Sequence, residues 1–152
     1  MTNLSKAFAD FGFSEALQRG LIDSGYTKPT LIQSQAIPEL MRGRDLIGCA
    51  QTGTGKTAAY ALPLLQKMHE APKLIMTKGA RVLVLSPTRE LAIQLHQAFG
   101  VYGRHLNLRR AVVFGGIAAR KQIKTMACGV DVLVATPGRL LDLVRQKHVT
   151  LE

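Results

Sequence analysis

A glycine-rich stretch in the first half of the chain has the residue types that hold phosphate groups. It reads Ala50-Gln51-Thr52-Gly53-Thr54-Gly55-Lys56-Thr57. Its glycines let the backbone curl so that N–H groups point inward at an anion, and a helix that starts here adds its positive end. Lys56 can reach the β- and γ-phosphates, and the Thr57 hydroxyl can hold Mg²⁺. We therefore expect this stretch to bind a nucleoside triphosphate.

The segments on either side support this interpretation. An apolar run over 45–50 predicts a strand, and residues 58–69 predict a helix, which is the order that a phosphate-binding loop needs. The strict pattern has Gly at its first position, where this chain has Ala50. The alternative is an ordinary glycine-rich turn with an incidental lysine. In the predicted strand, Cys49 is expected to be buried and reduced.

A glutamine upstream has two interpretations. Thr30 and Gln33 have the spacing of a capping box, in which the glutamine side chain reaches back to the Thr30 N–H. The Gln33 amide also has the donor and acceptor that match the N6/N7 edge of adenine. From the residues alone, the cap is favoured.

Two arginines follow predicted strands in the same way. Each strand is followed by a Ser-Pro or Thr-Pro turn, and then Arg89 or Arg139 falls in the first turn of a helix, where a positive charge opposes the helix dipole. A bound phosphate would reverse that effect. The alternative is an ordinary N-cap with an arginine pointing to water. The recurrence of this arrangement in a basic part of the chain favours the phosphate interpretation.

The elements that must position these residues alternate along the chain. Helices are expected over 14–24, from 30 to about 41, over 118–127 and over 140–146. A further helix, with Arg89 in its first turn, is expected to end at about 102. Strands are expected over 81–85, 111–114 and 132–135, the first of them buried on both faces. Such alternation predicts an α/β fold with a parallel sheet and flanking helices, and with ligands at the carboxyl ends of the strands.

Composition narrows the class of protein. The length of 152 residues predicts one domain, and its 47% hydrophobic residues are typical of a globular protein. No apolar run is long enough for a membrane span, and no signal pattern is present, so we expect a cytoplasmic protein without a membrane partner. Two cysteines and four scattered histidines suggest no metal cluster.

Charge points to a polyanionic partner. The net charge is +10, and residues 81–152 carry eleven basic and four acidic residues against nine and six in residues 1–80. Nucleic acid is the leading candidate, and a generally basic surface is the alternative.

These stretches together resemble the DEAD-box family of ATP-dependent RNA helicases, of bacterial type. Residues 25–33 (Gly-Tyr-Thr-Lys-Pro-Thr-Leu-Ile-Gln) are similar to its adenine-recognising Q motif, and residues 50–57 to its motif I, which carries Ala at the first position. Residues 87–92 (Pro-Thr-Arg-Glu-Leu-Ala), 115–116 (Gly-Gly) and 136–139 (Thr-Pro-Gly-Arg) are similar to its RNA-contacting motifs Ia, GG and Ib. The resemblance implies an incomplete RecA-like P-loop domain, with a helical Q-motif region over 1–43 and the RecA-like part over 44–152.

The resemblance also implies roles for single residues. Gln33 would read adenine, with Tyr26 stacking on the base and Phe8 in the same pocket, which favours the second interpretation of Gln33. The other residues implied to bind ATP are Lys28, Gln51, Thr52, Gly53, Thr54, Gly55, Lys56 and Thr57. Lys56 and Thr57 would be catalytic, with Thr57 holding Mg²⁺. The residues implied to grip single-stranded RNA, through its backbone and independently of sequence, are Pro87, Thr88, Arg89, Gly115, Gly116, Thr136, Pro137, Gly138 and Arg139.

One departure limits the expected activity. The family's Asp-Glu-Ala-Asp and Ser-Ala-Thr motifs should follow Leu151, and none of the ten acidic residues stands in their place. We expect an N-terminal piece of a helicase that binds ATP and RNA but does not hydrolyse ATP. The alternatives are a non-catalytic nucleotide- and RNA-binding module and a P-loop kinase, the latter disfavoured because the two arginines would have no purpose.

The same departure predicts a defect in the sheet. In this family, the strands with the missing motifs lie between the phosphate-loop strand and the strands that end at Ser86 and Ala135. The strands over 45–50 and 132–135 should therefore each have an unpaired apolar edge. We expect the chain to pair these edges with another copy, or to leave the phosphate loop mobile.

Overall fold

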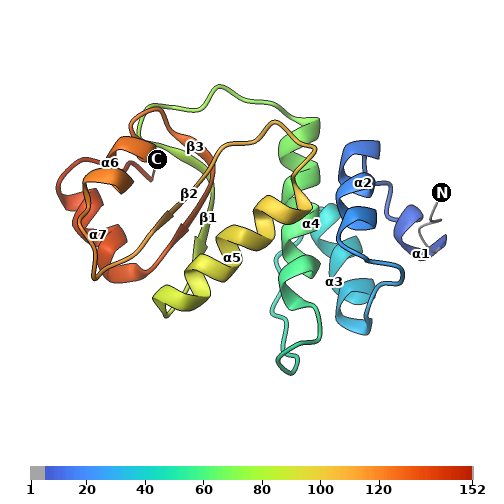
Figure 1. Ribbon diagram of the computed structural model, residues 1–152. Helices are drawn as coiled ribbons and strands as arrows, with labels where there is room; N and C mark the ends of the chain where they lie inside the picture. Colours follow the sequence, from blue (N-terminus) through green and yellow to red (C-terminus); the bar gives the residue numbers. More distant parts are fainter. Residues whose placement is uncertain (1–5, 152) are drawn as a thin grey trace. The chain divides into compact units, whose positions relative to one another are not determined.

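The computed structural model describes residues 6–151, so the outermost ends of the predicted regions, 1–5 and 152, lie outside it. The elements in chain order are α1 Lys6–Ala9, α2 Glu15–Asp23, α3 Leu31–Met41, α4 Lys56–Glu70, β1 Ala80–Leu85, α5 Arg89–Tyr102, β2 Arg110–Val113, α6 Arg120–Met126, β3 Val130–Ala135 and α7 Pro137–Arg145 (Figure 1). Each predicted helix and the last three predicted strands are present, with ends that differ by a few residues. No described helix is long and apolar enough to cross a membrane.

The chain divides into two compact units. The first comprises residues 1–71 and 98–107, and the second comprises 72–97 and 108–152. The helix α5 contributes its first nine residues to the second unit and the remainder to the first.

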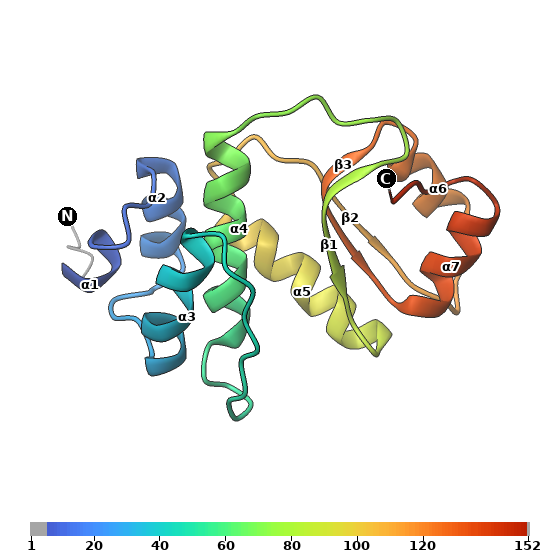
Figure 2. The ribbon, with the colours of Figure 1, turned by 180° about the vertical axis from the view of Figure 1, so that it is seen from behind.

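The first unit is helical. Ser14 caps α2 by accepting a hydrogen bond from the Leu17 N–H, and α3 follows the predicted capping box at Thr30 and continues past Pro38. The longest helix, α4, packs against both α2 and α3, and the three lie side by side in Figures 1 and 2. The core of the first unit consists of fully or almost fully buried side chains from these helices: Leu17, Leu21, Ile37, Leu62 and Leu65.

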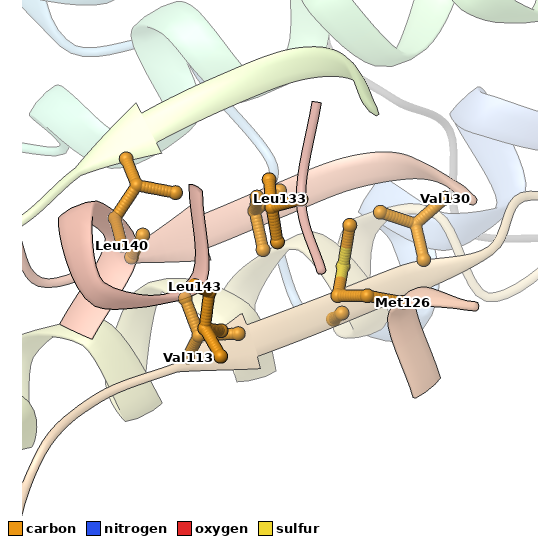
Figure 3. Close-up of a cluster of buried hydrophobic side chains, with 9 residues drawn as sticks. Val113, Met126, Val130, Leu133, Leu140 and Leu143 are labelled. Atoms are coloured by element: carbon orange, nitrogen blue, oxygen red, sulfur yellow. The ribbon is translucent and has the colours of Figure 1, made fainter. Parts of the chain in front are cut away.

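The second unit contains a three-stranded parallel sheet with the order β1-β3-β2. The central strand β3 is buried along its whole length. On one face, apolar side chains of α6 and α7 pack onto the strands, and Figure 3 shows Met126, Leu140 and Leu143 pointing toward Leu133 and Val113. At the amino end, Asp131 is buried, forms an ion pair with Arg81 at 3.0 Å and accepts a hydrogen bond from the Arg109 N–H.

The strand predicted over 45–50 is absent, which is a correction. Residues 44–51 form no regular element, Ile47 is 95% exposed, and Cys49 is exposed rather than buried. A strand exists only as part of a hydrogen-bonded ladder, and the described sheet pairs only β1, β3 and β2. An apolar run without a neighbouring strand therefore keeps its backbone groups in water.

Two further expectations about strand burial are wrong. The strand ending at Ala135 was expected to show an unpaired edge, but it is β3, which has a neighbour on each side. The strand over 81–85 was expected to be buried on both faces, but β1 lies at an edge of the sheet, with Leu83 38% and Leu85 56% exposed. The apolar edge thus belongs to β1.

Candidate nucleotide and RNA sites

The predicted phosphate loop lies in the first unit and ends in a left-handed turn. Gly53 and Gly55 have φ angles of +80° and +87°, values that favour glycine. Gly55 is the N-cap residue of α4, so the helix begins at Lys56 as the motif requires. The loop therefore presents the amino end of a four-turn helix, which favours an anion.

The Lys56 side chain folds back onto its own loop. Its Nζ atom donates to the carbonyl oxygens of Ala50 and Gln51, the second at 3.0 Å, while the Thr54 hydroxyl donates to the same Gln51 oxygen at 2.7 Å. The ammonium group thus lies against neutral acceptors. A phosphate entering the loop would replace them with a charge-assisted partner, which binds an ammonium more strongly.

Gln33 joins this loop to α3. Its side chain has no exposed surface, its Oε1 atom accepts from the Thr30 N–H at 3.0 Å, and its Nε2 atom donates to the Gly55 carbonyl at 3.2 Å. The first bond confirms the predicted cap. The second was not predicted, because residues 22 positions apart gave no sequence signal of contact. Both ends of the amide therefore hold backbone groups of the protein.

The aromatic residues of the predicted adenine pocket form a cluster of their own. Phe8 is fully buried, with its ring edge-on to Tyr26 at 6.2 Å between centroids. The Tyr26 hydroxyl lies 2.8 Å from that of Tyr102, and burial together with this bond raises the pKa of Tyr102. Sequence reasoning missed Tyr102, which lies 76 residues away. Phe8 thus supports Tyr26 and offers no free face to a ligand, while Lys28 is exposed.

A hollow of about 320 Å³ lies between the start of α3 and the phosphate loop. It is lined by Thr30, Leu31, Ile32, Gln35, Cys49, Ala50 and Thr54. Its volume is in the range of small-molecule sites, and its walls are mainly apolar. Gln33 and Tyr26 are not among its lining residues, although Gln33 contacts the phosphate loop at Gly55.

Thr57, the predicted Mg²⁺ ligand, lies in the first turn of α4. Its hydroxyl hydrogen-bonds to Tyr60, which lowers the pKa of that tyrosine against the larger rise caused by burial. Among the described residues, no group of three or more His, Cys, Asp or Glu side chains could hold a metal ion. The assignment of Thr57 to Mg²⁺, together with phosphate oxygens, therefore stays a prediction.

In the second unit, the three predicted RNA-contacting segments meet at one edge of the sheet. Leu85 of β1 and Val113 of β2 both lie opposite Ala135 of β3, so the strands end in register. The Ser86 N–H donates to the Ala135 carbonyl at 2.9 Å, and the Thr136 N–H donates to the Val113 carbonyl at 3.0 Å. The turns after the strands are thereby fixed beside one another at the carboxyl edge, where ligands of parallel sheets bind.

The Arg89 side chain lies beside Phe114 and Gly116. Its guanidinium group lies 5.8 Å from the centroid of the Phe114 ring, and an added Cβ at Gly116 would be 3.3 Å from its Nη1 atom. The side chain is 49% exposed and lies 3.6 Å from Glu90, which is a weak surface ion pair. Arg89 is therefore held in place by a ring while its charge remains accessible.

Arg139 bonds to the loop that follows the glycine pair. Its Nη2 atom donates to the Ile117 carbonyl at 2.9 Å and its Nη1 atom to Gln122 Oε1 at 3.1 Å, while Gln122 donates to the Phe114 carbonyl at 3.1 Å. The alternative of an arginine pointing to water is therefore wrong for Arg139. Phe114 and Gln122 were not predicted from the sequence, and they contact the two arginines of the predicted RNA site.

The remaining predicted RNA residues lie on the surface of this edge. Thr136 is half-buried, and the exposed residues are Pro87, Thr88, Gly115, Gly116, Pro137 and Gly138. The edge therefore presents backbone groups and small side chains between two arginines, which suits a phosphodiester backbone better than base edges.

Comparison with known proteins decides the family. The model of the DEAD/DEAH box helicase family matches residues 30–152. The chain belongs to the DEAD/DEAH box helicase family. It is 44% identical over 146 residues to DEAD-box ATP-dependent RNA helicase 24 of Oryza sativa subsp. japonica, an alignment that covers 96% of this chain and 19% of that protein.

Two solved helicase structures share the fold. The RNA-helicase Prp28 from Chaetomium thermophilum bound to ADP matches 100% of this chain and 37% of its own, at 34% identity and a TM-score of 0.87. A hypothetical ATP-dependent RNA helicase from Sulfolobus tokodaii matches 90% of this chain and 38% of its own, at 34% identity and a TM-score of 0.79. The fold is thus that of the RecA-like domains of helicases.

The chain spans only a part of these relatives. It covers 19% to 30% of the length of the first curated DEAD-box helicases that it matches. The proteins named above come from a plant, a fungus and an archaeon, so the bacterial-type assignment stays a prediction.

Proposed function

We propose that this chain binds ATP with Mg²⁺ and the backbone of single-stranded RNA, as the N-terminal part of an ATP-dependent RNA helicase. The observation that supports this most directly is the meeting of three predicted RNA segments at one carboxyl edge of the sheet, fixed by the Ser86 and Thr136 hydrogen bonds. The division into a helical region over 1–43 and a RecA-like part over 44–152 is part of the proposal. So are the cytoplasmic location and the edge-mediated homodimer.

The phosphate loop fits a nucleoside triphosphate. Its glycines have the left-handed backbone that such a loop needs, and Lys56 has only carbonyl partners to give up. In the proposed complex, residues 51–57 hold the phosphates, Thr57 holds Mg²⁺, and Gln33 and Tyr26 contact the adenine. The bound ion would neutralise phosphate charge. Gln33 would have to exchange its bonds to Thr30 and Gly55 for the base, and Phe8 would act through Tyr26.

The RNA edge fits recognition that ignores base sequence. Arg89 offers an accessible charge, and Arg139 keeps the glycine loop in shape through Ile117. Phosphate contacts position a strand but carry no sequence information. We therefore expect weak binding that is equal for different sequences and falls steeply with salt.

Fluorescence anisotropy with labelled single-stranded RNAs at several salt concentrations tests this. Arg89→Gln should weaken binding to all sequences alike and reduce the slope of log K against log salt by about 0.7, the value for one lost phosphate contact on a single strand. Arg145→Gln, an exposed position at the end of α7, is the control and should leave the slope unchanged. A preference for one sequence that persists at high salt would contradict the proposal.

The second candidate is a non-catalytic nucleotide- and RNA-binding module, which uses the same residues. RNA-stimulated phosphate release from a version of the protein extended beyond Glu152 separates the two. A helicase should release phosphate when RNA is added, and the Lys56→Ala variant should not. Nucleotide and RNA binding without any stimulated release would favour the module.

A further inference from the structure

A second hollow, here called the edge hollow, opens beside β2 in the second unit. It has a volume of about 280 Å³ and is lined by residues of β2, by His96 of α5, by Phe114 and Ile117, and by residues of α6. Strand β2 pairs with β3 alone among the described strands, so the hollow lies along an outer edge of the sheet. Its two basic lining residues, Arg110 and Lys121, lie outside the sequence motifs discussed above.

The rim of the edge hollow is basic. Arg110 at the start of β2 and Lys121 on α6 both line it and are exposed, and neither forms an ion pair within the described residues. No carboxylate is among its lining residues. Burial, with a smaller contribution from the nearby Arg110 charge, lowers the pKa of His96 of α5, although a hydrogen bond to the Arg110 backbone acts in the opposite direction.

The inner wall of the edge hollow is shared with the proposed RNA edge. Phe114 and Ile117 line it, and the same Phe114 ring lies under Arg89, while the Ile117 carbonyl accepts from Arg139. Gln122, which bonds to both Arg139 and the Phe114 carbonyl, lines it as well. The hollow is therefore continuous with the loop that the two arginines hold.

We infer that the edge hollow binds one further nucleotide of the RNA strand held at the carboxyl edge of the sheet. The phosphate would lie between Arg110 and Lys121, and the sugar or base would lie against Phe114 and Ile117. Single-strand binding proteins combine the same two features, a basic groove along the backbone and an aromatic or apolar surface for the bases. This inference rests on the proposed RNA binding and extends the contact beyond the three family motifs.

The test compares two double variants that each remove two positive charges. Arg110→Gln with Lys121→Gln removes the rim of the edge hollow, and Lys124→Gln with Arg145→Gln removes exposed charges that do not line it. Binding is measured by anisotropy on oligouridylates of increasing length, at several salt concentrations. All four side chains are exposed, so both double variants should melt at the temperature of the unaltered chain. Thermal melting therefore serves as the control for folding.

The edge-hollow variant should lose affinity several-fold for long oligonucleotides and hardly at all for the shortest that bind. Its salt slope on long RNA should fall by about 1.4, which corresponds to two lost contacts, whereas the control should keep the wild-type slope. Photo-crosslinking with 4-thiouridine RNA should label α6 (Arg120–Met126) in the wild type and in the control double variant but not in the edge-hollow variant. Equal losses in both double variants, or a loss independent of length, would overturn the inference.

Failure of the proposed RNA binding would give a different set of results from failure of the edge-hollow inference. If the unaltered chain binds no RNA, or if Arg89→Gln has no effect, the proposed RNA edge itself is wrong. If Arg89→Gln weakens binding while the edge-hollow variant matches the wild type at every length, only the inference about the edge hollow is wrong.

Discussion

At the scale of single residues, Gln33 holds two separate backbone groups in place. It satisfies an N–H at the start of α3 and the carbonyl of Gly55 at the start of α4, and it is fully buried. A buried amide with both ends bonded stabilises the fold, while its removal leaves partners unsatisfied at about 1–3 kcal/mol. Recognition of adenine by Gln33 would therefore be coupled to the shape of the phosphate loop.

This coupling can be measured with Gln33→Ala. We expect the unaltered chain to bind ADP and ATP better than GDP and GTP, and the variant to lose this difference, worth about 1–3 kcal/mol for one bidentate contact. It should also lose thermal stability, because Thr30 and Gly55 lose their partner. The control is Ser34→Ala, an exposed position on the same helix. Competition with labelled nucleotides checks the first effect, and equal binding of all nucleotides to the unaltered chain would contradict it.

Gly55 provides a second prediction with an internal control. Gly55→Ala pays the left-handed cost of roughly 1–2 kcal/mol, and in addition its Cβ would lie 2.4 Å from Gln33 Nε2. Gly12 has a φ of +71°, but a Cβ added there would meet nothing within 4 Å, so Gly12→Ala carries the backbone cost alone. Denaturant unfolding should therefore find Gly55→Ala less stable than Gly12→Ala.

Most of the excess should disappear when Gly55→Ala is made in the Gln33→Ala background, because both Gln33 atoms are then gone and the close contact that remains is Thr30 Oγ1 at 3.3 Å. If the full stability difference between the two glycine variants persists in the Gln33→Ala background, its cause lies elsewhere in the loop.

At the scale of elements, strand β1 carries the apolar edge of the sheet. Leu85 is 56% exposed, and β1 has one neighbour among the described strands. Exposed apolar edges favour pairing with another chain. The prediction of edge pairing, made from the sequence for the strands over 45–50 and 132–135, therefore applies to β1.

We expect the mass of the chain in sedimentation experiments to rise with protein concentration. Leu85→Lys should suppress the rise, because a charge on an edge strand opposes pairing. Leu141→Lys on α7, where the wild-type side chain is 51% exposed, is the matched control and should leave association unchanged. A chain that remains monomeric at all concentrations would show that this edge is protected in another way.

At the scale of the whole molecule, the two sets of predicted site residues fall into separate compact units. The residues predicted to bind nucleotide lie in the first unit and those predicted to bind RNA lie in the second, and α5 contributes residues to both units. Phosphoryl transfer needs more than binding, since a residue must orient the attacking water and metal ligands must neutralise charge. Within residues 1–152, the residues predicted to take part in this chemistry are Lys56 and Thr57.

We therefore predict that residues 1–152 alone bind ATP without hydrolysing it, with or without RNA. Phosphate release should remain at the level of the buffer under conditions where nucleotide binding is detected. Lys56→Ala serves as the control for contaminating ATPases. A rate that follows the purified chain and disappears with Lys56→Ala would prove the prediction wrong.

The sequence by itself determined what depends on neighbours along the chain. The helix starting at Lys56, the cap at Thr30, the three strands and the motifs that follow them are all local patterns of polarity, glycine and capping residues. These patterns also sufficed for the family, because the motifs stand in a fixed order.

The tertiary structure decided which of these elements gain partners. The apolar run over 45–50 resembles a strand in sequence, yet it forms none, while β3 gains neighbours on both sides and β1 only one. The bond from Gln33 to Gly55, the Tyr26–Tyr102 pair and the contacts of Arg139 with Ile117 and Gln122 join residues distant in sequence. A backbone or side-chain group is satisfied only by what lies beside it in space, and composition and spacing do not specify that neighbour.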